Sequence, residues 1–139
     1  MAQILNTCGH VDMIVHCGDM DVDCDYIASL RPQTPLLAVQ GNNEFFCQRP
    51  YHIVDEVEGQ KIYITHGHKE RVKAGYDGLI AAAKKKGCAL AFFGHTHQQE
   101  DITKDGIRLI NPGSATGMYG SFAILNITSN AITVNFHVL

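Results

Sequence analysis

Short apolar runs that stop at a glycine and then at polar residues recur along this chain. The clearest run covers residues 88–93 and ends in Gly94, followed by His95 and His97. An uninterrupted apolar run of this length is typical of a buried strand, and a glycine allows a sharp turn after it. Three more runs end in the same way, before Gly18-Asp19, Gly41-Asn42 and His66-Gly67-His68. The pattern therefore predicts strands that present polar side chains at their carboxyl ends.

The rest of the pattern predicts helices and hairpins around these strands. Helices are expected at residues 21–30 and 76–86, where apolar positions share one face or alanine dominates. Residues 1–7 have enough apolar positions for the tail of a helix but not for a whole amphipathic helix. Strands are expected at 13–15, 36–39, 52–57, 61–65 and 88–93, with a hairpin over 101–110 and closing strands at 121–127 and 131–138. A tight turn is expected at 111–114. Strands that alternate with helices indicate an α/β protein, here a single domain over residues 1–139.

The composition argues against some classes of function. The chain has 139 residues, a net charge of -3 and five cysteines without a paired spacing. Its charge argues against a large basic surface for nucleic acids, and no apolar stretch is long enough to span a bilayer. The cysteine usage indicates reduced thiols, so we expect a cytoplasmic protein without a membrane partner.

The polar strand ends predict a metal site. Side chains two residues apart on an extended backbone point the same way, so His95 and His97 can aim two imidazoles at one ion. That motif alone is also compatible with two surface histidines. Asp19, Asn42 and His66 at the other strand ends strengthen the prediction, because open α/β sheets gather ligands at this edge. Mixed oxygen and nitrogen ligands suit manganese, iron, nickel or zinc better than calcium or magnesium.

The motifs together resemble those of the calcineurin-like metallophosphoesterases, in particular the small single-domain phosphodiesterases of bacteria and archaea. The matching segments are His16-Cys17-Gly18-Asp19, Gly41-Asn42-Asn43-Glu44, Thr65-His66-Gly67-His68, Gly94-His95-Thr96-His97 and Asn111-Pro112-Gly113-Ser114. The resemblance implies a four-layer αββα sandwich of two mixed sheets flanked by helices. It also implies two divalent ions, with manganese expected and nickel, iron or zinc as alternatives. Asp19 would bridge the ions, Asn42, His66 and His95 would complete one site, and His97 would belong to the other.

Two departures from the family pattern change these expectations. The opening strand that ends in Asp-x-His is not found, and Gly9-His10-Val11-Asp12 fits better as the loop after a first helix. The missing piece is about 25 residues at usual element lengths, and a natural chain that starts further upstream is one explanation. The first metal site then keeps Asp19 and His97 alone, so we expect the other site to bind the tighter ion and turnover to be impaired. Strand edges exposed by the gap favour a homo-oligomer.

The second departure concerns the groups that would act on a substrate. Asn43 stands where many relatives have a histidine that serves as general acid. His68 is the candidate catalytic residue, in contact with the substrate phosphate or in support of a ligand, and a structural role stays open. Asn111 and Ser114 could line the site, although a turn is favoured for them. We interpret Lys84, Lys85 and Lys86 as a solvated helix end rather than a phosphate site.

The resemblance implies a phosphoesterase, specifically a phosphodiesterase, that hydrolyses a small phosphoester with metal-activated water. The alternative is a catalytically inactive protein-binding scaffold, since the superfamily includes a retromer subunit of that kind. The retained ligand residues argue for the enzyme, because a scaffold has no need of them.

Overall fold

A five-stranded mixed sheet lies at the centre of the computed structural model, which describes residues 1–117 and 119–139. Its strands lie in the order β3 (His52–Val57), β4 (Gln60–Thr65), β5 (Leu90–Phe92), β7 (Ile107–Pro112) and β6 (Gln99–Lys104). The three inner strands β4, β5 and β7 are parallel, and β3 and β6 pair antiparallel at the two edges. The carboxyl ends of β4, β5 and β7 therefore lie at one edge of the sheet.

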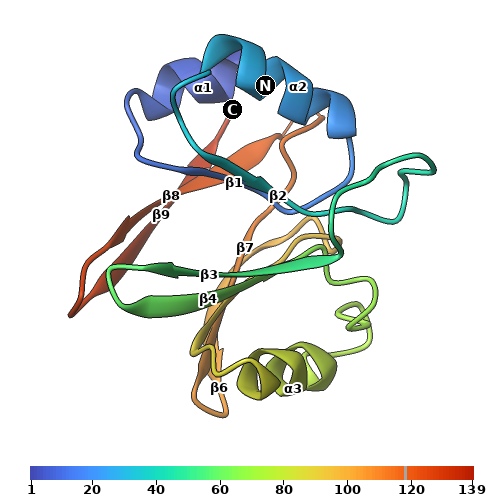
Figure 1. Cartoon of the computed structure of the whole chain (residues 1–139), viewed down its shortest axis with the longest axis vertical. Coiled ribbons are helices and arrows are strands. Elements are labelled where there is room, and N and C mark those ends of the chain that lie inside the picture. Colours follow the sequence, from blue (N-terminus) through green and yellow to red (C-terminus); the bar gives the residue numbers. More distant parts are fainter. Residues whose placement is uncertain (118) are drawn as a thin grey trace.

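Two separate strand pairs and two helices cover one face of this sheet, and a third helix covers the other (Figure 1). β1 (Ile14–His16) pairs in parallel with β2 (Leu36–Ala38), and β8 (Ser121–Ile127) pairs antiparallel with β9 (Ile132–Val138). Beyond them lie α1 (Ala2–Cys8) and α2 (Asp21–Leu30), while α3 (Asp77–Lys85) packs on the opposite face. The expected four-layer α/β class is confirmed, but the second sheet is divided into two strand pairs.

Most predicted elements form within one or two residues of their expected bounds, and one turn does not. The turn expected at 111–114 begins later, because Asn111 and Pro112 still belong to β7 and pair with Glu100 and Gln99. Pairing with the edge strand β6 thus extends β7 as far as Pro112. A proline is tolerated at the end of a strand. Among the described residues, none of the helices reaches the length and apolar character that crossing a membrane requires.

The two faces of the central sheet are packed differently. On the α3 face, Leu79, Phe93 and Leu109 are fully buried in one cluster. On the opposite face Ile64 is fully buried, but Val15 and Leu125, which pack against the same cluster, are only partly buried. The layer of β1–β2 and β8–β9 therefore closes less completely over the sheet than α3 does.

A test of the well-packed face is Leu79→Ala in α3, where Leu79 is 0% exposed. The lost contacts and the cavity left behind should lower the free energy of unfolding by about 2–5 kcal/mol. The control is Leu30→Ala at the end of α2, where the side chain is 51% exposed and about 0.5 kcal/mol or less is expected. Urea unfolding followed by circular dichroism measures both, and equal effects would contradict this account of the core.

Candidate metal centre

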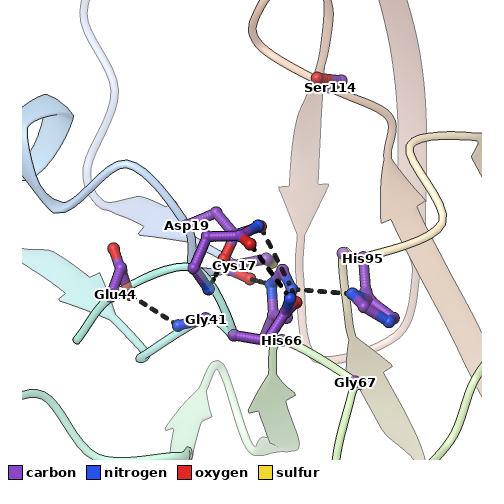
Figure 2. A network of polar contacts seen from close by, with 12 residues as sticks. Cys17, Asp19, Gly41, Glu44, His66, Gly67, His95 and Ser114 are labelled. Atoms are coloured by element: carbon purple, nitrogen blue, oxygen red, sulfur yellow. Dashed lines mark hydrogen bonds and ion pairs between the residues drawn. The ribbon is translucent and has the colours of Figure 1, made fainter. Parts of the chain in front are cut away.

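Four of the residues predicted to bind metal lie together at the carboxyl ends of neighbouring strands (Figure 2). His66 follows β4 and lies against His95, which follows β5 after a short turn. Asp19 follows β1, and Asn42 follows β2. Because each pair of strands is parallel, the two layers present their carboxyl ends to the same place. The structure thus gathers Asp19, Asn42, His66 and His95 from both layers.

His66 is the buried centre of this group. Its Nδ1 lies 2.7 Å from the main-chain oxygen of Cys17, which can only accept, so Nδ1 carries a proton and, in the neutral imidazole, Nε2 keeps its lone pair. Nε2 lies 2.9 Å from Asn42 Oδ1 and 3.5 Å from Asp19 Oδ2. These two oxygens also carry lone pairs and no proton. Lone pairs that converge in this way fit a cation, so the residues match the divalent ion that the sequence predicts.

Asp19 is held as a carboxylate by Asn43. The main-chain N–H of Asn43 donates to Asp19 Oδ1 at 3.1 Å, and its side-chain amide donates to Oδ2 at 2.8 Å. Partial burial alone would raise the pKa of Asp19, but these hydrogen bonds and the nearby His66 bring the pKa below its usual value. Asn43 therefore orients a metal-ligand candidate, a role that its residue type alone does not reveal.

Gly18 and Gly41 allow the loops after β1 and β2 to lie close to Asp19 and His66. A Cβ atom on Gly41 would collide with Asp19 Oδ1, and one on Gly18 would lie 2.9 Å from His66 Nδ1. The main-chain N–H of Gly41 also donates to Glu44 Oε2 at 2.7 Å, which fixes the loop after β2 (Figure 2). Larger residues at either position would displace the carboxylate or the imidazole.

The backbone of three predicted ligands lies in the left-handed region. Asp19, His95 and His97 have φ values of 61°, 65° and 59°, a conformation that costs on the order of 1 kcal/mol or more for a residue with a side chain. Asn111 supports the histidine loop, because its fully buried amide donates to Gly94 O at 3.0 Å and to Thr96 Oγ1 at 2.9 Å. Asn111 is therefore a positioning residue. Its Oδ1 also accepts from the main-chain N–H of Gly113 at 2.9 Å, which agrees with the turn role that was favoured from the sequence.

His97 and Ser114 lie apart from the four gathered residues. His97 is exposed and has no hydrogen bond to them among the described residues, although it lines the same cavity as Asp19 and His95. Ser114 also lines this cavity and bonds to Thr116 at 3.2 Å, away from the group (Figure 2). Of the two predicted metal sites, only the one built around His66 has its protein side chains brought together.

His68 borders the group without joining it. Its ring centroid lies 5.4 Å from that of His66 and 6.2 Å from that of His95, and its Nδ1 is buried with no hydrogen-bond partner among the described residues. Burial, followed by the charges of His66 and Lys69, lowers the pKa of His68. Burial, followed by the charge of His66, also lowers the pKa of His95. The lowered pKa favours the neutral imidazole of both residues, which is the form of histidine that binds a metal.

A second group of possible ligands was not expected from the sequence. Atoms of Asp21, Glu44 and Cys47 lie within 4.8 Å of one another. Each already has a partner, however: Asp21 pairs with Arg49 at 2.5 Å, Glu44 accepts from Gly41, and Cys47 Sγ accepts from the main-chain N–H of Arg49. These contacts hold the loop after β2 against α2, and we assign no metal to them.

Several known proteins have sequences related to this chain. A probable metallophosphoesterase of Methanocaldococcus jannaschii is 32% identical over 107 residues, which cover 77% of this chain and 55% of the relative. A phosphodiesterase of the same organism is 28% identical over 123 residues, which cover 78% of this chain and 70% of that protein. The chain thus spans little more than half of the first relative's length.

Solved structures show the same fold. A predicted phosphoesterase from Streptococcus pneumoniae matches with a TM-score of 0.74 and 28% identity, over 94% of this chain and 75% of that one. Vps29 from Entamoeba histolytica matches with a TM-score of 0.86 and 23% identity, over 100% of this chain and 83% of that one. The model of the calcineurin-like phosphoesterase superfamily domain matches residues 1–130. The chain therefore belongs to the calcineurin-like phosphoesterase superfamily, whose members bind divalent metals.

Proposed function

We propose that this protein is a metal-dependent phosphodiesterase that acts on a small phosphoester in the cytoplasm. The observation that carries the proposal is the convergence of His66 Nε2, Asn42 Oδ1 and Asp19 Oδ2. When His66 is neutral these atoms direct lone pairs at one another, and a cation between them satisfies all three. Membership of the superfamily and the similarity to a phosphodiesterase support the reaction class. The five free cysteines are in keeping with a reducing compartment.

Asp19, Asn42, His66 and His95 would hold one ion, for which we propose manganese. A divalent ion there supplies positive charge for a phosphoryl oxygen and lowers the pKa of water. The chain's own contribution is orientation, because Cys17 O fixes the tautomer of His66 and Asn43 fixes the carboxylate of Asp19. A second ion would have only Asp19 and His97, so we propose that it binds weakly and that turnover is reduced.

Basic and neutral groups beside this ligand set suit a phosphate. Lys69 lies with its Nζ 3.7 Å from the centroid of the Tyr51 ring, next to His68. Neutral His68 can donate one hydrogen bond to a phosphate oxygen. Asn43 cannot release a proton, and its amide is already bonded to Asp19. The described residues therefore offer charge stabilisation for a phosphodiester but no evident proton donor for its leaving group.

A non-catalytic binding scaffold is the second candidate. Phe45 and Phe46, in the loop that begins with Asn42 and Asn43, are 91% and 97% exposed. Adjacent exposed aromatic side chains are typical anchors of protein interfaces. This second candidate would be favoured if the protein bound no metal and hydrolysed no phosphoester.

The first test is metal binding by His95→Ala, measured by titration calorimetry with Mn²⁺ at pH 7.5. Loss of a residue that only hydrogen-bonds to a metal ligand typically weakens metal affinity about 10–100-fold. Loss of the ligand itself should therefore weaken it about 100-fold or more. The control is His52→Ala, where an exposed imidazole stacks on Tyr63 and should leave affinity unchanged. Full retention of binding in His95→Ala would remove His95 from the metal centre.

The second test is hydrolysis of bis-p-nitrophenyl phosphate with added Mn²⁺. Asp19→Asn should lower kcat/KM about 100-fold or more, because it removes the one negative charge among the ligands. Asp105→Asn is the matched control, since Asp105 is exposed in a hairpin turn with φ 51°, which asparagine tolerates. Chelation of the metal should stop the reaction in the parent chain. Equal activity of both variants would refute the assignment.

The third test is the dependence of rate on the leaving group. General acid catalysis contributes about 10²–10⁴-fold where a donor is present, and the residues that the structure describes offer none beside the ligand set. We therefore expect an aryl phosphodiester to react at least about 100-fold faster than an alkyl phosphodiester at equal metal concentration. Comparable rates for the two esters would show that the chain has a proton donor after all.

A further inference from the structure

Basic residues gather in the loop between β4 and α3, directly after the metal-ligand candidate His66. Lys69, Arg71 and Lys73 are all exposed in residues 67–75, which we call the basic loop. The chain as a whole has a net charge of -3, so this local positive charge is not a general property of its surface. Positive charge beside a catalytic centre attracts anionic ligands.

Main-chain hydrogen bonds fold the basic loop into a compact turn. The N–H of Arg71 donates to His68 O at 3.2 Å. The N–H of Val72 donates to Gly67 O at 3.1 Å. The side chain of Val72 is buried and packs against Gly67, where a Cβ atom would lie 2.8 Å from Val72 Cγ2. Because the loop has internal bonds and a buried anchor, its exposed side chains extend from fixed main-chain positions.

Glu70 is the acidic residue of the basic loop, and its carboxylate is directed at two buried hydroxyl groups. Oε1 accepts from Tyr63 at 3.0 Å, and Oε2 accepts from Thr65 Oγ1 at 3.0 Å. Tyr63 and Thr65 are both buried. None of the ion pairs between described residues involves Lys69 or Lys73. The charges of these two lysines are therefore left for a ligand.

Lys69 lies two aromatic rings away from the metal-ligand candidate His66. Its Nζ is 3.7 Å from the centroid of the Tyr51 ring, whose face attracts the ammonium group. The centroid of the Tyr51 ring lies 5.9 Å from that of His68, which lies 5.4 Å from that of His66. The contact with Tyr51 thus keeps the ammonium group beside His68, although Lys69 is an exposed residue.

Lys73 acts on a different part of the metal centre. After burial and the charge of His66, the charge of Lys73 is the next cause that lowers the pKa of His95. Charges interact this strongly only over short distances, because water and salt screen them. Arg71 lies between the two lysines in the sequence but is not among the main charges that act on His95. Lys69 and Lys73 are thus the cations of the basic loop that border the metal centre.

The positive charge at this place exceeds what a simple phosphodiester balances. One divalent ion with the carboxylate of Asp19 leaves a single net positive charge, which the single negative charge of a phosphodiester group matches. Lys69 and Lys73 add two positive charges that such a group does not use. A terminal phosphate carries about 1.5–2 negative charges at pH 7, which matches two lysines. A carboxylate or a hydroxyl group at the same place would bring one charge or none.

We propose that Lys69 and Lys73 bind a second phosphate of the substrate, so that the substrate is a phosphodiester that also carries a terminal phosphate. This inference rests on the phosphodiesterase function proposed above and names its substrate class. The diester group lies at the ion, and the terminal phosphate lies over the basic loop. Lysine binds phosphate as a point charge. The site therefore selects the second phosphate by charge and position rather than by the shape of the group that carries it.

The first measurement is binding, which needs no turnover. Thymidine 5′-monophosphate and thymidine 3′,5′-bisphosphate are titrated into the Mn²⁺-loaded protein in a calorimeter. Both ligands bring the same 5′-phosphate to the ion, so the difference between them reports on the 3′-phosphate. We expect the bisphosphate to bind about tenfold more tightly or better, because one hydrogen bond to a charged group is worth about that factor. The preference should fall as NaCl is raised, since salt screens exposed charges.

Three exposed residues of the same loop give two test variants and a matched control. Lys69→Gln and Lys73→Gln each remove one of the charges, so each should lose most of the preference for the bisphosphate. Arg71→Gln also removes one positive charge but should keep the preference. Affinity for the monophosphate should change much less in all three variants. Substitutions of exposed residues rarely disturb folding, and thermal melting of each variant checks this.

The second measurement is hydrolysis of thymidine 5′-(p-nitrophenyl phosphate), with and without a 3′-phosphate. In both esters water attacks the phosphorus at the 5′ position, the bond to the p-nitrophenyl oxygen breaks, and p-nitrophenolate leaves. The 3′-phosphate is unchanged by the reaction. It should lower KM about tenfold and leave kcat nearly unchanged, because it binds equally in the ground state and the transition state.

Two outcomes would overturn the proposal outright. One is equal binding of the two nucleotides by the parent protein, and the other is an equal loss of preference in Arg71→Gln and in the lysine variants. The proposed enzyme function can fail separately. Tighter binding of the bisphosphate without hydrolysis of either ester would refute the phosphodiesterase and leave the lysines as a phosphate site. Hydrolysis of both esters with equal KM would support the phosphodiesterase and refute the site for a second phosphate.

Discussion

The hydrogen bond from His66 to the carbonyl oxygen of Cys17 connects the central sheet to the layer above it. His66 follows β4 of the five-stranded sheet, and Cys17 follows β1 of the parallel pair. This bond fixes the imidazole so that Nε2 faces Asn42 and Asp19. One buried side chain thus sets both the junction of the layers and the chemistry of the site. With His66 neutral, the junction holds opposed lone pairs, so metal binding should also strengthen the contact between the layers.

The layer above the central sheet is loosely packed beside this junction. Val15, Leu37 and Leu125 contact the cluster on the sheet and are only partly buried. Because β1 leads directly to Cys17 and Asp19, the bond from His66 to Cys17 O fixes the end of a strand that its own packing holds less tightly.

The motif pattern was sufficient to predict the elements and four members of the candidate site. Apolar runs followed by glycine and polar residues placed the strand ends that carry Asp19, Asn42, His66 and His95. Periodicity placed the helices, with α2 at its predicted bounds. These features follow from local sequence, because strand burial, turn formation and helix amphipathicity depend on nearby residues.

Other features depend on contacts between distant segments, so only the tertiary structure reveals them. Asn43 orients Asp19 from 24 positions away, and Asn111 reaches Gly94 from a strand whose end was interpreted as a turn. The division of the second sheet depends on which strand edges pair with one another. The sequence by itself determined the family, the strand ends and the ligand types, because these reside in local motifs. The structure decided which groups position those ligands and how the strands pair, because both result from packing across the chain.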